Sequence, residues 1–200
     1  MARLTREESR ERTRALLLAA GRSVFARFGY GGASIDTIAE TAGFSKGAFY
    51  SNFESKEAIF LELLAENMAT ELAASRDLAQ DGRTVEEVID RIAERYAVDQ
   101  ADQEWCLLSV EFALHAARNP ALKEQFADLF DRQYRGVATI IEHLARLSGT
   151  AVEDSIKAAA LFIAFRQGIA LDRSSKGASL TEADAKLALR RFMGGLLGLY

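Results

Sequence analysis

Hydrophobic residues recur every three to four positions along most of the chain, which is the spacing of one face of an α-helix. These long periodic segments, together with a single proline, predict an all-α protein of about nine helices. The expected helices cover roughly residues 6–28, 35–41, 46–52, 56–78, 85–96, 102–119, 120–147, 158–165 and 181–200.

Small polar residues stand where these helices begin, as N-caps do. Thr5, Thr84 and Thr150 each precede a glutamate by three residues, which is the spacing of a capping box. Asn119 directly precedes the proline, which suits the first position of a helix. The remaining caps are expected at Ser34, Ser45, Ser55, Asp102 and Thr181.

The most informative stretch is SIDTIAETAGFSKGAFYSNFESKE, residues 34–57. Its pattern predicts two short helices on either side of Gly43, which can adopt the positive φ that a tight turn requires. Ser34 and Ser45 would cap the two helices. Two helices joined by a short turn with a glycine form a helix-turn-helix, whose second helix can enter the DNA major groove.

The same stretch resembles the signature of the tetracycline-repressor (TetR) family. The match departs mildly at Phe44, where the family often has valine, and at Asn52, where histidine is common. The resemblance implies a three-helix DNA-binding domain at 1–54 and a helical effector-binding and dimerising domain at 55–200. The matching positions are Ile38, Ala39, Ala42, Gly43, Ser45, Gly47, Phe49, Tyr50, Phe53, Lys56 and Glu57.

The resemblance also implies the residues that contact DNA. Tyr50 and Lys56 match the phosphate-contacting tyrosine and lysine of the family, and hydroxyl groups at capped helix ends can add contacts at Ser34, Thr37 and Ser45. Phe49 suits helix packing better than base reading. The positions that would face the bases are Lys46, Gly47, Ala48, Phe49 and Asn52.

Charge is distributed unevenly along the chain, whose net charge is −4. Residues 1–60 carry nine basic and seven acidic side chains, which leaves −6 for the remainder. A mildly basic N-terminal part joined to an acidic remainder permits binding to a polyanion such as DNA. A short arm before Thr5 holds Arg3, which either touches DNA or stays in solvent.

The sequence gives little support to an enzyme, a cofactor site or a metal site. No H-E-x-x-H, C-x-x-C or phosphate-binding glycine loop occurs, and the two histidines lie on different predicted helices. One cysteine, Cys106, suits a reducing compartment, and no apolar run approaches the ~20 residues of a membrane span. We therefore expect a cytoplasmic protein.

Polar side chains on apolar helix faces indicate a ligand site. Asn67, Gln133 and Arg166 each interrupt an otherwise apolar stripe. A buried polar group needs a partner, which is either a ligand or an internal hydrogen bond or water. With neighbouring apolar residues they outline a pocket for a small, largely apolar effector, formed by Phe60, Leu64, Asn67, Met68, Trp105, Phe112, Phe130, Gln133, Tyr134 and Arg166.

The resemblance, taken with these patterns, implies a homodimeric, ligand-released repressor that binds operator DNA. The last two helices offer the apolar surface for the dimer interface. The alternative is a helical dimeric binding or scaffolding module whose helix-turn-helix no longer reads DNA.

Overall fold

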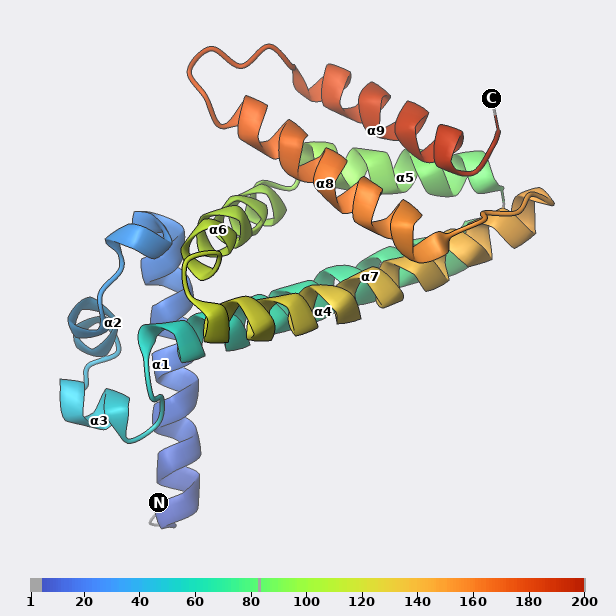
Figure 1. Ribbon diagram of the computed structural model, residues 1–200. Helices are drawn as coiled ribbons and strands as arrows, with labels where there is room; N and C mark the ends of the chain where they lie inside the picture. Colours follow the sequence, from blue (N-terminus) through green and yellow to red (C-terminus); the bar gives the residue numbers. More distant parts are fainter. Residues whose placement is uncertain (1–4, 83, 200) are drawn as a thin grey trace.

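The computed structural model describes residues 5–82 and 84–199, so Arg3 lies outside the described residues. Within these ranges the protein is all-helical and contains no strand, as the sequence predicts (Figure 1). The helices are α1 (Arg6–Gly32), α2 (Ile35–Thr41), α3 (Lys46–Tyr50), α4 (Lys56–Asp81), α5 (Val85–Val98), α6 (Gln100–Ala116), α7 (Pro120–Ser148), α8 (Ser155–Arg173) and α9 (Glu182–Leu196).

The helices form a small head and a larger body (Figure 1). The head consists of α1, α2 and α3, and the body consists of α5 to α9 packed with most of α4. Helix α4 begins beside the head and runs along α7, while α5, α8 and α9 cover the other side of the body. The C-terminal half of α1 packs on α6 and α4, which connects the head to the body.

Most predicted N-caps are confirmed. The hydroxyls of Thr5, Ser34, Ser45, Ser55, Thr84 and Thr181 and the amide oxygen of Asn119 each accept a backbone N–H of the following helix. Thr5 and Glu8 form the expected capping box. These bonds satisfy donors that have no partner within the helix, and each cap contributes about 1 kcal/mol.

Two predicted caps are wrong. Helix α6 begins two residues before Asp102, because the carboxylate of Asp99 accepts the Asp102 N–H at 3.2 Å and so caps the helix. Helix α8 is capped by Asp154, whereas the Thr150 hydroxyl bonds the Ser148 hydroxyl at 2.9 Å at the end of α7. The Asp102 side chain is buried and has a different role, described below.

The end of α1 is more ordered than the flexible turn that its glycines predict. Gly29 has a φ of 70°, which kinks the chain, and a further helical turn then extends to Gly32. The kink turns Tyr30 inward, where it is 3% exposed and packs between Phe60 and Phe112 with ring centroids 5.0 Å from each. Tyr30 thereby becomes part of the joint between head and body.

Candidate DNA interface and effector cavity

The helix-turn-helix has the predicted geometry. The Ser34 hydroxyl accepts the Thr37 N–H at 3.0 Å, and the Ser45 hydroxyl accepts the Ala48 N–H at 3.3 Å. Gly43 has a φ of 76° in the turn, a conformation that other residues rarely adopt. The turn and the two caps fix α3 relative to α2, and α3 therefore presents its outer face to solvent.

The outer face of α3 carries side chains that are free to meet DNA. Tyr50 is 51% exposed, and Lys46 and Gly47 are exposed as well. The Lys46 ammonium pairs with the Asp36 carboxylate at 2.9 Å, an exposed contact between the two motif helices. Because solvent screens such pairs, Lys46 can exchange Asp36 for a phosphate or a guanine at little cost.

Two residues predicted to read bases have internal roles instead. Phe49 is fully buried and packs against the ring of Phe53 with centroids 5.7 Å apart, so its side chain cannot reach a base. The Asn52 side chain donates to the Ala48 carbonyl at 2.8 Å and closes the end of α3. Packing therefore explains Phe49, whereas the Oδ1 atom of Asn52 is buried and has no partner among the described residues.

Lys56, predicted to contact phosphate, is anchored within the head. Its ammonium donates to the Tyr30 carbonyl at 2.9 Å and to the Ala33 carbonyl at 3.0 Å, and it lies 4.4 Å above the Tyr30 ring. An ammonium has three N–H donors, so one remains for a phosphate. Lys56 therefore ties the end of α1 to the start of α4, besides any contact with DNA.

A polar junction, formed by Tyr30, Glu57, Glu111 and His115, connects head and body. The Tyr30 N–H donates to Glu111 of α6 at 2.8 Å, and the Tyr30 hydroxyl donates to Glu57 of α4 at 2.7 Å. His115 of α6 lies 3.5 Å from the same Glu57 carboxylate. Burial raises the pKa of Glu57, but hydrogen bonds from Tyr30 and from its own backbone outweigh burial and hold the pKa below its usual value.

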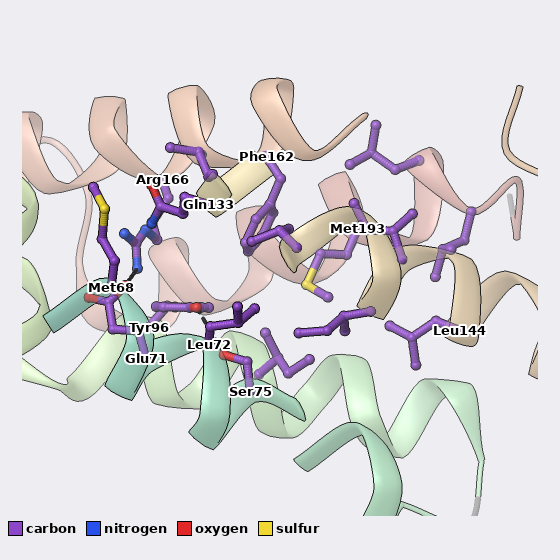
Figure 2. Close-up of a pocket in the computed structure, with 17 residues that line it drawn as sticks. Met68, Glu71, Leu72, Ser75, Tyr96, Gln133, Leu144, Phe162, Arg166 and Met193 are labelled. Atoms are coloured by element: carbon purple, nitrogen blue, oxygen red, sulfur yellow. Dashed lines mark hydrogen bonds and ion pairs between the residues drawn. The ribbon is translucent and has the colours of Figure 1, made fainter. Parts of the chain in front are cut away.

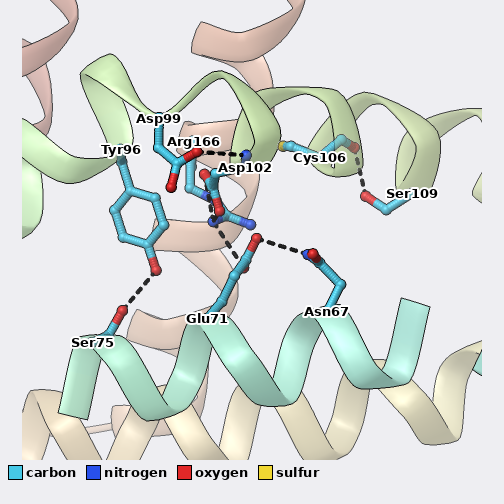
Figure 3. Close-up of polar contacts among 9 residues, drawn as sticks. All are labelled: Asn67, Glu71, Ser75, Tyr96, Asp99, Asp102, Cys106, Ser109 and Arg166. Atoms are coloured by element: carbon cyan, nitrogen blue, oxygen red, sulfur yellow. Dashed lines mark hydrogen bonds and ion pairs between the residues drawn. The ribbon is translucent and has the colours of Figure 1, made fainter. Parts of the chain in front are cut away.

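A buried charge cluster, formed by Arg166, Glu71 and Asp102, lies deeper in the body (Figure 3). The Nη1 group of Arg166 on α8 lies 3.1 Å from Glu71 on α4 and 3.0 Å from Asp102 on α6. Asn67 donates to the second oxygen of Glu71 at 3.1 Å, and the guanidinium stacks 4.6 Å from the Tyr96 ring. Two of the polar groups predicted to face a ligand, Asn67 and Arg166, thus have partners within the protein.

The cluster holds more acid than base within a dry environment. Burial, followed by a hydrogen bond with Glu71, raises the pKa of Asp102 to about 8, although Arg166 opposes the shift. Two neighbouring carboxyl groups cannot both ionise easily when they are buried, which favours the protonated form of Asp102. Burial also raises the pKa of the nearby Cys106 to about 11, which keeps this thiol protonated and unreactive.

A cavity inside the body, called the main cavity below because most helices of the body line it, adjoins this cluster (Figure 2). It lies between α4, α5, α7, α8 and α9, and its volume of about 40 Å³ has room for about three water molecules. Three of the residues predicted to bind the effector, Met68, Gln133 and Arg166, line it. Stripe residues of helices distant in sequence complete the wall, mainly Leu72, Tyr96, Ile140, Leu144, Phe162, Met193 and Leu197.

A second, smaller cavity lies on the other side of Arg166. It brings together seven of the ten residues predicted to bind the effector, namely Leu64, Asn67, Met68, Trp105, Phe130, Gln133 and Arg166. Tyr134 lies outside it, in an open groove between α6 and α7. Phe60 and Phe112 are fully buried and stack with ring centroids 4.8 Å apart, so they support the joint rather than line either cavity.

Gln133 differs from the other polar residues that line the cavities. It is 8% exposed and lines both cavities, and its Oε1 atom has no hydrogen-bond partner in the part of the chain that the structure describes. The Nε atom of Arg166 is buried and unpartnered as well. Among the described residues, no group of three or more histidine, cysteine, aspartate or glutamate side chains is placed to hold a metal ion.

The geometry defines a helix-turn-helix protein with a cavity-bearing helical body. Residues 17–63 match the family model of bacterial regulatory proteins of the tetR family, and residues 85–198 match the C-terminal model of BetI-type transcriptional repressors. The chain therefore belongs to the tetR family, whose members are regulators that bind operator DNA. None of the helices in the described ranges is long and apolar enough to cross a membrane.

Curated relatives match parts of the chain. It is 38% identical over 71 residues to the transcriptional repressor AcnR of Corynebacterium jeikeium, covering 34% of this chain and 38% of that protein. It is 33% identical over 126 residues to the uncharacterised regulator YdgC of Bacillus subtilis, covering 61% and 60%. The chain thus matches less than two thirds of the length of either relative.

The fold extends over nearly the whole chain in solved structures. A transcriptional regulator from Rhodococcus sp. Rha1 is 25% identical, covers 92% of this chain and 96% of its own, and superposes with a TM-score of 0.75.

Proposed function

We propose that the protein is a homodimeric transcriptional repressor that binds operator DNA and releases it when a small apolar effector occupies the body. The observation that carries this proposal is the capped α3 helix, which exposes Tyr50 and Lys46 on a fixed scaffold. Residues 1–54 would form the DNA-binding domain and residues 55–200 the effector and dimerisation domain.

The proposed DNA surface consists of phosphate contacts around a small reading face. Capped helix ends offer backbone N–H groups to phosphate, and the Tyr50 hydroxyl and the free N–H of Lys56 can add two more donors. Gly47 and Ala48 are small enough for close approach to the groove. The contacts are assigned to Ser34, Thr37, Ser45, Lys46, Gly47, Ala48, Tyr50 and Lys56.

The route from effector to head involves two helices, α4 and α6. Both contribute a carboxylate to the buried charge cluster, Glu71 and Asp102, and both contribute one to the polar junction, Glu57 and Glu111. Arg166 therefore ties α4 to α6 inside the body, and Tyr30 ties them at the head. An effector that enlarges the cavity beside Arg166 would separate the two helices and move Tyr30 with the head.

The effector releases DNA because it binds one conformation of the body more tightly than the other. A cavity of about 40 Å³ is too small for an effector, so binding selects or creates a wider body. Operator half-sites lie ~34–36 Å apart, or at multiples of that distance, and a shift of a few ångströms would misalign one head of a dimer. The same coupling lowers the affinity for effector when DNA is bound.

The proposed dimer interface lies on the outer side of α8, with α9 beside it. Residues Leu161, Ala164, Gly168 and Leu171 recur at helical spacing, and all four are exposed in the single chain. A contiguous apolar stripe of this kind is typical of an interface. Two copies of α8 and α9 related by a twofold axis would form a four-helix contact.

The dimer proposal is tested by replacing Leu161 and Leu171 with glutamate. We expect monomers, because four buried charges would face each other across the twofold axis. Leu147→Glu on α7 is the control, since Leu147 is also exposed. Light scattering measures the mass, and a dimer of unchanged mass and helicity in the double variant would place the interface elsewhere.

DNA titration tests the main proposal. The protein is titrated against the DNA upstream of its own gene and against unrelated DNA, at several salt concentrations. We expect Tyr50→Phe to weaken binding to both sequences alike, because phosphate contacts position the protein without specifying bases. Tyr134→Phe, in the distant groove, should bind as the parent does. Equal affinity of the parent for both DNA sequences would favour the alternative, a helical binding module that no longer reads DNA.

A further inference from the structure

The two cavities beside Arg166 are divided by polar atoms that have no partner. Gln133 projects from the middle of α7 and is more than nine-tenths buried, yet its Oε1 acceptor makes no hydrogen bond. The Nε donor of Arg166 is also buried and has no partner among the described residues. Both residues line the main cavity (Figure 2) and the smaller one. An unpartnered buried polar atom costs stability, and a ligand that pairs with it recovers that cost.

We propose that the effector is an elongated apolar molecule with an uncharged head that both donates and accepts a hydrogen bond, such as an alcohol. The hydroxyl would donate to Oε1 of Gln133 and accept from Nε of Arg166. This inference rests on the proposed role of the cavity as the effector site, and it adds the chemical class of the ligand.

Charge at the polar end of the cavity excludes an ionised head. Glu71 and Asp102 already surround the guanidinium of Arg166, with side chains 9% and 3% exposed. A carboxylate head would add a third acid to this group. Both carboxyl groups already pair with Arg166, so an ammonium head would give up its own hydration and meet only acids that have a partner.

The remainder of the cavity determines the shape of the ligand. Gln133 and Leu144 are eleven residues apart on α7, a rise of roughly 16 Å, and the wall between them is apolar. Side chains from α7, α8 and α9 form this wall, among them Ile140, Phe162, Met193 and Leu197. In the wider body that effector binding requires, an extended chain can therefore lie along α7 with its head at Gln133, whereas a compact polar ligand would leave the apolar end empty.

The test compares probes with the same chain length and different heads, namely 1-octanol, heptyl methyl ether, octanoate and octylammonium. The only tryptophan, Trp105, lines the second cavity and is 5% exposed, so its fluorescence reports binding without a label. We expect 1-octanol to bind about tenfold more tightly than the ether, which accepts but cannot donate. Tighter binding of octanoate or octylammonium than of 1-octanol would overturn the proposal.

Gln133→Met separates a ligand contact from a structural role. The substitution replaces the unpartnered amide with an apolar group of similar size, so the thermal stability of the protein should stay equal or rise. The affinity for 1-octanol should fall about tenfold, because its hydroxyl loses an acceptor, whereas the affinity for the ether should not change. Gln125→Met, at an exposed position of the same helix, is the control. Unchanged affinity for 1-octanol in Gln133→Met would overturn the proposal.

Binding of the probes is measured without DNA, and operator binding is measured without probes. Sequence-specific DNA binding together with no preference for 1-octanol would therefore reject the ligand class and leave the regulator intact. Loss of sequence-specific DNA binding in the parent protein would instead reject the proposed function.

Discussion

Helices α4 and α6 are joined twice, and the two joints differ mainly in burial. At the head, the side chains of Glu57 and His115 around Tyr30 are 26% and 46% exposed. In the body, none of the three side chains of the buried charge cluster exceeds 9% exposure. Bulk water can replace a lost partner at the head, whereas the cluster in the body is shielded from bulk water. The head joint can therefore adjust during a movement, whereas the body joint must either stay intact or be replaced by a ligand.

The largest effect is expected from Arg166→Met. The substitution keeps the bulk of the side chain but leaves two carboxyl groups buried without their counter-charge, which should destabilise the protein by about 3–5 kcal/mol. Urea denaturation followed by circular dichroism measures the loss. Arg135→Met removes a fully exposed partner of Asp131 and should change little. If the two substitutions lower the free energy of unfolding equally, burial does not determine how much a charge contributes to stability.

Sequence reasoning succeeded where the determinants are local. The caps at Ser34 and Ser45 and the turn at Gly43 depend on neighbours within a few residues, so spacing alone predicts them. Asp102 was misassigned because Asp99 offers the same cap three residues earlier. Either acid can cap a helix, and only the contact with the buried Arg166 shows that Asp102 has a different role.

The joints between helices could not be predicted. Arg166 is 95 residues from Glu71, and Tyr30 is 81 residues from Glu111. Each acid lies on a helix where a solvent-exposed charge would fit the pattern equally well. Periodicity tells which face of a helix is apolar but not which other helix it meets, so Glu71 and the far wall of the cavity were missed.

A second prediction concerns the pH dependence of the body joint. The pKa of Asp102 is about 8 in the folded protein and about 3.9 in an unfolded chain. The folded state therefore binds a proton that the unfolded state has released, and stability falls as the pH rises from about 4 to about 8. Each pKa unit of difference between the folded and unfolded states changes the free energy of unfolding by about 1.4 kcal/mol. Asp102→Asn cannot titrate and should flatten the slope in urea titrations across this range. Parallel pH profiles of parent and variant would place the proton elsewhere.

The head joint should be weaker. Glu111→Ala removes the acceptor of the Tyr30 N–H, and because Glu111 is exposed, water can replace it at a cost of about 1 kcal/mol. The effect on regulation should exceed the effect on stability. The variant should bind operator as the parent does, but 1-octanol should release it less effectively, since α6 no longer pulls on the head. Glu104→Ala, at an exposed position of the same helix, is the control. If 1-octanol releases the Glu111→Ala variant from operator DNA as fully as the parent, the effector acts on the head through α4 and not through α6.

The smallest effect on stability is expected from Asp36→Asn in the head. The pair between Asp36 and Lys46 is exposed, so solvent screening and side-chain entropy cancel most of its attraction, and the unfolding midpoint should not move measurably. DNA binding should become tighter, because the substitution removes a negative charge beside α3 and frees Lys46 for the groove. We expect tighter binding to all DNA sequences and a steeper dependence of the affinity on salt.

The control separates the two causes of this gain. Glu40→Gln, an exposed acid on the same helix that has no pairing with Lys46, separates the two causes. If both variants gain equally, only the overall charge of the head matters. A larger gain for Asp36→Asn means that Asp36 holds Lys46 away from DNA.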